Sequence, residues 1–201
     1  MPSDAAAFER CIAAGGVVVF GADTVYGLAC DPDSREAVAR LYALKGRAPD
    51  KPSAVMFFDL EPAVAALPEL GPRTRALMAR LLPGGVTLLL PDPHRRFPLA
   101  GGEGLGLRVP DVPALRAVRR PVLQSSANAA GAVDARRLAD VPEAIRAGAD
   151  LVLDAGELPG TPSTVIDLRG FEDAGEWAVV RAGAVPAEAV ERAVAGGTVA
   201  P

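Results

Sequence analysis

Residues 17–27 read VVVFGADTVYG, an apolar run that ends in glycine and passes into a polar turn. A continuous run of four apolar residues bounded by glycines is typical of a strand that is buried on both faces. The polar pair Asp23-Thr24 follows this run, and the carboxyl ends of strands are where α/β sheets bind ligands. The stretch therefore predicts a buried strand that leads to a polar turn at residues 23–27.

The same alternation of short apolar runs and helical patterns continues along the chain. Apolar runs predict further strands at 54–58, 86–90, 105–109, 122–124, 151–153, 164–168 and 177–181. A capping box at Asp33 and Glu36 predicts a helix that ends at residues 45–47, before Pro49. Further start and stop signals predict helices from Pro72 to residue 81, at 111–118, at 140–147 and after Pro186. Strands interleaved with helices at irregular spacing favour an α+β fold with a mixed sheet over a doubly wound one.

One strand makes a specific prediction about an arginine. Leu105, Leu107 and Val109 recur with the period of a strand, so they face one side of the sheet. Arg108 must then face the other side, where its guanidinium is free to pair with a carboxylate.

Composition bounds the class of protein. The chain has 201 residues, of which 50% are hydrophobic, and its net charge is -4. This length and hydrophobic content predict one globular domain over residues 1–201. Cys11 and Cys30 are isolated, and we expect both to be buried reduced thiols. Because the start lacks a signal-peptide pattern and no apolar run reaches the roughly 20 residues that span a bilayer, we expect a cytoplasmic protein without a membrane partner. Local arginine clusters such as Arg119-Arg120 fit either solvated helix faces or a nucleic-acid surface.

Several common kinds of active site are excluded by the residues present. His94 is the only histidine, so histidine-based metal sites and catalytic triads are ruled out. The sequence has no Walker A motif and no nucleophile elbow, and the glycines at 101–106 precede a strand where the dinucleotide fingerprint would open a helix. An enzyme built on this chain must work without a protein nucleophile or an imidazole base.

Polar residues at strand ends and turns remain as candidates. Lys45, Arg47 and Lys51 lie close to a loop, which suits a triphosphate but also fits an exposed helix end. Ser126 and Asn128 follow the 122–124 strand directly, as a ligand site or as an ordinary turn.

Read in order, these blocks resemble the YrdC-type threonylcarbamoyl-adenylate synthase family. The blocks are DTVYGL at 23–28, KGRAPDKP at 45–52, PGGVTL at 83–88, LRVP at 107–110, SAN at 126–128 with Gly131, PSTVID at 162–167 and RAG at 181–183. Each block is short, and their shared order over most of the chain carries the resemblance. It implies a YrdC-like twisted mixed sheet flanked by helices, with an open, positively lined cavity.

The resemblance also assigns roles to residues. It makes Lys45 and Arg47 the catalytic pair, and it assigns threonine binding to Thr24, Arg108 and Ser163. It assigns ATP binding to Arg47, Lys51, Ser126, Asn128 and Arg181.

The implied reaction suits a chain without a nucleophile of its own. The threonine amine takes up bicarbonate or CO2, and the resulting carbamate attacks the α-phosphate of ATP and expels pyrophosphate, so the protein must supply positioning and positive charge. No permanently bound cofactor or protein metal site is implied, and Mg2+ is expected to arrive with ATP. The product would pass to a separate complex that makes threonylcarbamoyladenosine in tRNA, and tRNA or double-stranded RNA is a further candidate partner.

Departures from the family pattern leave alternatives open. Gly21-Ala22 stands where the family usually has Pro-Thr, Ser125 where it has Thr, and Met56 where a histidine often helps to hold threonine. One alternative is a YciO-like paralogue that binds RNA or nucleotide without making this product. Another is the carbamate-adenylating domain of hydrogenase maturation, whose zinc-binding cysteines are missing here. We also expect no extra C-terminal domain of the kind that longer members carry.

Overall fold

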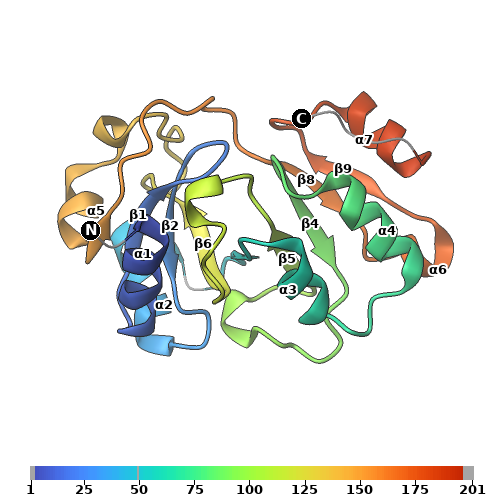
Figure 1. The fold of residues 1–201 in the computed structure, drawn as a ribbon, viewed down its shortest axis with the longest axis horizontal. Helices are drawn as coiled ribbons and strands as arrows, with labels where there is room; N and C mark the ends of the chain where they lie inside the picture. The colour runs from blue at the N-terminus through green and yellow to red at the C-terminus, as the bar shows by residue number, and fades with distance from the viewer. Residues whose placement is uncertain (1–2, 49, 197–201) are drawn as a thin grey trace.

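The computed structural model describes residues 3–48 and 50–196, and within them nine strands form one mixed sheet (Figure 1). The strands run in the order β7-β1-β2-β6-β3-β5-β4-β8-β9. The pairs β1/β7, β3/β5 and β4/β8 are parallel and the other neighbours are antiparallel, which confirms the prediction of a mixed sheet. The strands are β1 Val18–Gly21, β2 Tyr26–Cys30, β3 Ala54–Met56, β4 Val86–Leu90, β5 Leu105–Arg108, β6 Val122–Ser126, β7 Leu151–Val152, β8 Thr164–Asp167 and β9 Ala178–Arg181.

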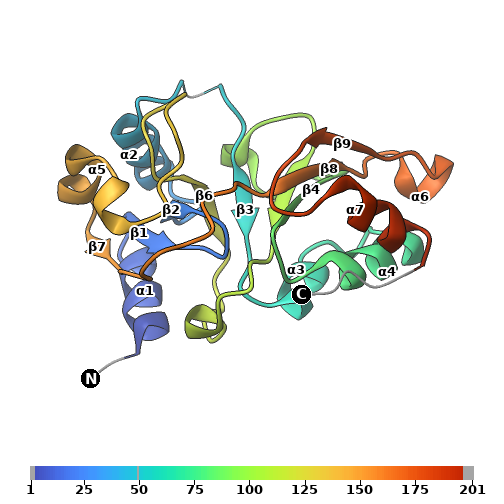
Figure 2. The ribbon, with the colours of Figure 1, turned by 90° about the horizontal axis from the view of Figure 1, so that it is seen from above.

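Helices gather at the two ends of this sheet. Figures 1 and 2 show α1, α2 and α5 beside β1 and β2, and α4, α6 and α7 beside β8 and β9. No described helix has the length and apolarity needed to cross a bilayer. The helices are α1 Asp4–Ala13, α2 Arg35–Lys45, α3 Leu60–Ala65, α4 Pro72–Leu81, α5 Glu143–Gly148, α6 Phe171–Ala174 and α7 Ala187–Val194, with 3-10 turns η1 Pro98–Ala100, η2 Pro113–Leu115 and η3 Leu138–Asp140.

Strand alternation divides the apolar side chains between two cores. In β5 and the residue that follows it, Leu105, Leu107 and Val109 all join the larger core, which helices such as α2 and α4 cover. The smaller core lies against α1, which contributes Phe8. Arg108 belongs to neither core, so it lies on the opposite side of its strand from its apolar neighbours, as period two predicts.

Helix α2 ends at Lys45, the first residue of the 45–52 block. Gly46 adopts a left-handed conformation, with φ 61° and ψ 32°, and closes the helix directly after Lys45. The expected capping box at its start is wrong by one residue, because the N-cap is Ser34, whose side chain accepts a hydrogen bond from the Ala37 amide.

Other predictions about the elements need correction. The 111–118 segment holds only the 3-10 turn η2, consistent with two prolines, at 110 and 113, that restrict a helix start. The expected turn at 23–27 ends early, because Tyr26 already pairs in β2. Strand β3 stops at Met56, α3 was not predicted, and Pro49 lies outside the described residues. Cys30 is buried as expected, whereas Cys11 is partly exposed.

Candidate functional site

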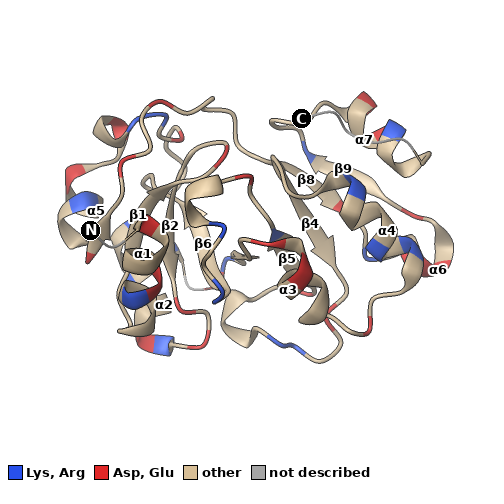
Figure 3. Cartoon of the chain, in the orientation of Figure 1, with Lys and Arg blue, Asp and Glu red and all other residues tan. Residues whose placement is uncertain are grey.

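A cavity of about 390 Å³ opens on the sheet face that carries Arg108. Its walls come from segments far apart in sequence, from Val25 in the first polar turn to Arg181 at the end of β9. Four arginines line it, against two carboxylates, Glu103 and Asp134, so the lining carries an excess of positive charge. Figure 3 shows basic and acidic residues interleaved over the rest of the chain, so this local excess is not a consequence of bulk charge. The lining arginines are Arg47, Arg108, Arg169 and Arg181.

Arg108 is held in a buried ion pair at this cavity. Its Nη2 donates to Asp23 Oδ1 at 2.7 Å and to Thr24 Oγ1 at 3.2 Å, and only 3% of the residue is exposed. Burial lowers the pKa of Arg108, as does the charge of Arg181, while Asp23 raises it. Among the described residues, the buried Nε of Arg108 has no hydrogen-bond partner. Two guanidiniums beside one carboxylate leave one positive charge unmatched, which suits a single bound anion.

Ser163 and Arg181 form a second polar cluster in the cavity wall. Arg181 Nη2 donates to the Ser163 carbonyl at 2.6 Å and to Ser163 Oγ at 3.1 Å. Ser163 Oγ also lies 2.8 Å from Thr87 Oγ1, which projects from β4. Because strand β9 supplies the arginine and the residue before β8 supplies the serine, the β8/β9 pairing fixes this cluster.

Lys45 is buried beneath the loop that follows β6, not exposed at a helix end. Its Nζ donates to Ser126 O at 2.7 Å, Ser126 Oγ at 3.2 Å, Asn128 O at 3.0 Å and Asn128 Oδ1 at 2.5 Å. The residue is 3% exposed, and burial together with Arg47 lowers the pKa of Lys45 to about 8. The ammonium therefore holds the 126–128 segment in place through hydrogen bonds, and Lys45 itself does not line the cavity.

Arg47 reaches the cavity two residues later. Its Nη2 donates to the Pro52 carbonyl at 2.6 Å, and its buried Nε is without a partner in residues 3–48 and 50–196. A buried guanidinium donor left unpaired at a cavity wall suits an oxyanion ligand. Lys51, by contrast, is exposed and does not line the cavity.

The structure thus brings most of the sequence-assigned residues together. Arg47, Ser126, Arg108, Ser163 and Arg181 line one cavity, while Thr24 touches it through Arg108 and Lys45 and Asn128 support its wall. Lys51 alone lies apart.

Sequence reasoning assigned no role to several polar residues that line the cavity, among them Thr87, Gln124, Asp134 and Arg169. Thr87 could have been found, since it is the one hydroxyl in the apolar run 86–90. Gln124 likewise ends the apolar run that begins at Val122. Asp134 and Arg169 lie in loops without a local sequence pattern, so only the three-dimensional structure places them at the cavity.

Comparison with known proteins identifies relatives of this chain. The family model of Sua5, YciO and YrdC proteins, described as "Telomere recombination", matches residues 10–183. The threonylcarbamoyl-AMP synthase of Chromohalobacter salexigens is 41% identical over 169 residues, which make up 79% of this chain and 89% of that protein.

Solved structures share the fold over nearly the whole chain. Sua5 of Pyrococcus abyssi, crystallised with L-threonine, superposes with a TM-score of 0.82 at 28% identity, over 97% of this chain and 58% of the other. YciO of E. coli superposes with a TM-score of 0.74 at 25% identity, over 90% of this chain and 89% of the other. The chain therefore spans a little over half of the Sua5 structure and most of YciO.

Proposed function

The chain belongs to the family of Sua5, YciO and YrdC proteins, and on that premise we propose that its cavity makes threonylcarbamoyl-AMP from L-threonine, bicarbonate and ATP. The observation that carries this proposal is the shared cavity. Arg108 and Ser163, assigned to threonine, open on the same space of about 390 Å³ as ATP-assigned groups, where one substrate can attack the other. Those ATP-assigned groups are Arg47, Ser126 and Arg181.

The threonine end is formed by Arg108, Thr24 and Ser163. Because the buried Nε of Arg108 has no hydrogen-bond partner among the described residues, Arg108 offers the threonine carboxylate a charge-assisted contact. The hydroxyls of Thr24 and Ser163 are then available for the amine and the hydroxyl of the substrate. This anchoring leaves the threonine nitrogen directed into the cavity.

The reaction needs no covalent step on the protein. The amine attacks the carbon of bicarbonate with loss of water, or that of CO2, to give a carbamate. A carbamate oxygen then attacks the α-phosphorus, the bond to the β-phosphate oxygen breaks, and pyrophosphate leaves with the electron pair. Arg47 and Arg181 neutralise the charge that builds up on the phosphates, which makes the enzyme a nucleotidyltransferase.

Mg2+ would enter with ATP and neutralise part of the triphosphate charge. The described residues contain no group of three or more acidic, histidine or cysteine side chains suited to a metal ion. Asp134 nevertheless lines the cavity together with Arg47 and Ser126. One carboxylate with substrate phosphates fits the way Mg2+ is usually bound, so Asp134 is the residue that would hold it.

The product determines the partners that we propose. An acyl-phosphate anhydride is reactive toward water, so it should pass promptly to a separate enzyme that modifies tRNA. We place this work in the cytoplasm, and we treat tRNA itself as a partner of the downstream enzyme more than of this cavity.

Pyrophosphate release that depends on threonine tests the proposal. With bicarbonate and ATP present, threonine should give clear turnover, serine about 10–200-fold less, and valine about 10⁴-fold less, because valine leaves a hydroxyl-binding group unpaired. Met56 stands where the family resemblance implies a histidine, and it is fully buried in the smaller core, so any contact with the substrate hydroxyl must come from elsewhere.

The opposite result identifies the competing function. If threonine gives no more turnover than valine while ATP still binds, the chain is a YciO-like paralogue that binds nucleotide or RNA without making this product.

A further inference from the structure

The segment 154–163, here called the strap, connects β7 to β8 without regular structure of its own. These two strands are consecutive in sequence but lie at positions one and eight of the sheet order. Figure 1 shows the strap crossing from the β7 end of the molecule to the β8 end. It passes the polar turn that carries Thr24, and it finishes at Ser163 in the cavity wall.

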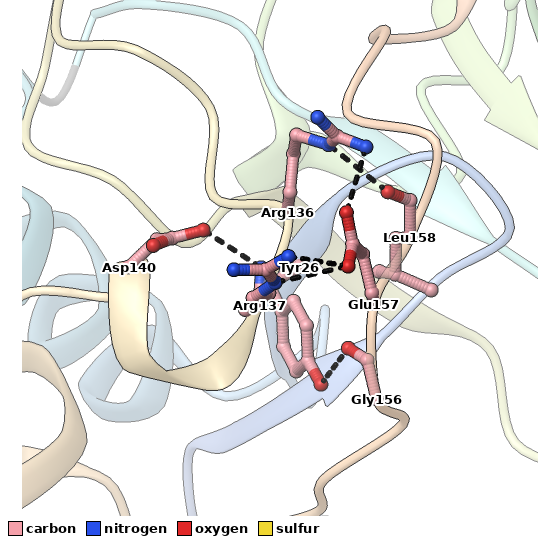
Figure 4. A network of polar contacts seen from close by, with 7 residues as sticks. All are labelled: Tyr26, Arg136, Arg137, Asp140, Gly156, Glu157 and Leu158. Carbon is pink, nitrogen blue, oxygen red and sulfur yellow. Dashed lines mark hydrogen bonds and ion pairs between the residues drawn. The ribbon is translucent and has the colours of Figure 1, made fainter.

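The hydroxyl of Tyr26 anchors the start of the strap. Tyr26 Oη lies 2.8 Å from Asp154 Oδ1 and 2.9 Å from the Gly156 carbonyl, and it accepts a hydrogen bond from the Ala155 amide at 2.9 Å. Figure 4 shows the tyrosine side chain reaching from its strand to Gly156. Tyr26 itself is fully buried, whereas Asp154, Ala155 and Gly156 are exposed, so the buried tyrosine holds an exposed segment against the body of the protein.

Gly21 allows the strap to approach this closely. A Cβ at Gly21 would come within 2.3 Å of the Ala155 Cβ, a distance that no pair of methyl groups tolerates. The chain thus has glycine at the point where β1 and the strap touch.

An exposed ion-pair cluster continues the anchorage. Glu157 accepts from Arg136 Nη2 at 2.9 Å and from Arg137 Nη2 at 2.5 Å, as Figure 4 shows, and the Leu158 amide donates to the Arg136 carbonyl at 2.8 Å. These side chains are about half exposed, and exposed ion pairs are each worth at most about 1 kcal/mol. The contacts of Tyr26, whose side chain is buried, should therefore contribute more to holding the strap.

The far end of the strap contacts the groups assigned to threonine. The Gly160 amide donates to the Thr24 carbonyl at 2.9 Å, and Ser163 follows three residues later. Of the ATP-side groups, Lys45 and Arg47 make no hydrogen bond to a strap residue within the described chain, whereas Arg181 donates to Ser163 at the end of the strap.

We propose that Tyr26 is a positioning residue for the amino-acid substrate, acting through the strap to hold Thr24 and Ser163 in place. The inference rests on the proposed function for the identity of that substrate. It adds that the threonine subsite depends on the strap more than the ATP subsite does, because only Arg181 of the ATP-side groups bonds a strap residue.

Tyr26→Phe tests this with little change in shape. We expect the KM for threonine to rise roughly three- to tenfold, the loss typical of one buried hydrogen bond, with ATP affinity within twofold of wild type. Gly21→Ala should act in the same direction because it displaces the strap sterically. Glu157→Gln should have a smaller effect, since its contacts are exposed.

Hydrogen exchange supplies a readout that is independent of catalysis. The amides of Ala155 and Gly160 should exchange faster in Tyr26→Phe than in wild type. Tyr42→Phe is the matched control, because it removes a buried hydroxyl that bonds Ser53 Oγ at 2.9 Å and the Lys51 carbonyl, and it should leave both strap amides at their wild-type rates.

Three outcomes separate the claims. Unchanged strap exchange in Tyr26→Phe, or a loss of ATP affinity as large as the rise in threonine KM, overturns this inference and leaves the proposed function standing. A wild-type protein without threonine-dependent pyrophosphate release overturns the proposed function and the substrate named here. Selective loss of threonine affinity with faster strap exchange supports both.

Discussion

Arg108 and Asp23 form an ion pair with 2.7 Å between Nη2 and Oδ1, and both side chains are almost entirely buried. Asp23 uses its second oxygen to accept the Asp111 amide at 3.2 Å, so one carboxylate joins the first polar turn to the segment after β5. The geometry of the proposed threonine subsite therefore depends on a residue that need not touch threonine.

Asp23→Asn should cost both stability and substrate affinity. Breaking a buried pair by neutralising one partner typically destabilises a protein by about 3–5 kcal/mol. Urea denaturation should show this loss, and threonine KM should rise in parallel. Glu143→Gln, which disrupts the exposed pair with Arg146, should change the free energy of unfolding by less than about 0.5 kcal/mol. Equal effects of the two substitutions would contradict the assignment.

Lys45→Met should weaken ATP binding more than it destabilises the fold. The substitution removes the donor that holds Ser126 and Asn128, but it also removes the cost of burying an ammonium. Calorimetry should show at least about a tenfold loss of ATP affinity, the equivalent of one charged hydrogen bond. An unchanged ATP affinity would mean that the 126–128 segment keeps its shape without this lysine.

The lowered pKa of Lys45 makes ATP binding dependent on pH. Burial lowers this pKa from 10.5 to about 8, so above pH 8 the side chain keeps only two N–H donors for its four acceptors. ATP affinity should therefore fall as the pH rises through 8.

Stability should follow the opposite trend over the same range. Below pH 8 the cost of burying the charge is fully present. Between pH 8 and 10.5 the unfolded chain binds more protons than the native one, so this group's contribution to the free energy of unfolding rises with pH. Lys45→Met should abolish both trends, and denaturation curves with calorimetry from pH 7 to 10 measure them.

Arg47→Ala should weaken ATP binding by about 1.5–3 kcal/mol through loss of a charge-assisted contact. Arg47→Lys should also be impaired if the phosphate contact is bidentate. Arg35→Ala provides the control, since Arg35 lies exposed at the start of α2, far along the helix from Lys45 and the Arg47 that follows it. Titration calorimetry that gave wild-type affinity for Arg47→Ala would remove Arg47 from the nucleotide site.

Divalent metal should bind only together with nucleotide. Asp134 is a single carboxylate, and one such group without phosphates binds Mg2+ weakly. Titration with Mg2+ should show binding in the presence of ATP and none without it, and Asp134→Asn should raise the Mg2+ requirement. Stoichiometric zinc in the purified protein, measured by elemental analysis, would contradict the expectation that it has no resident metal.

Local sequence pattern predicted those parts of the fold that local physics controls. The 86–90 strand has the expected limits because an apolar run between glycine and proline leaves no other choice, and Arg108 faces away from its neighbours because alternation requires it. Pro72 opens α4 for a similarly local reason.

Features set by distant segments could not be predicted in this way. Lys45 looked like an exposed helix end, and only the β2/β6 pairing brings Ser126 and Asn128 over it. Lys51 sits in a cationic block but lies away from the cavity, since the chain between Gly46 and Pro52 turns its side chain to solvent. The strap has no hydrophobic periodicity, and only the folded structure shows that it contacts Tyr26 and Thr24.

The strand order also has a consequence for the time course of folding. The amide of Val17 donates to the carboxylate of Asp150, which is 133 residues away in sequence. Strand β4 likewise completes its parallel pairing only when β8, much later in the chain, has joined the sheet. Closing such long loops is entropically costly before the contacts are made, so chains with this topology fold slowly compared with helical bundles of similar size. The cavity, whose walls come from segments as far apart in sequence as Val25 and Arg181, should be among the last regions to acquire native protection in a pulse-labelling experiment.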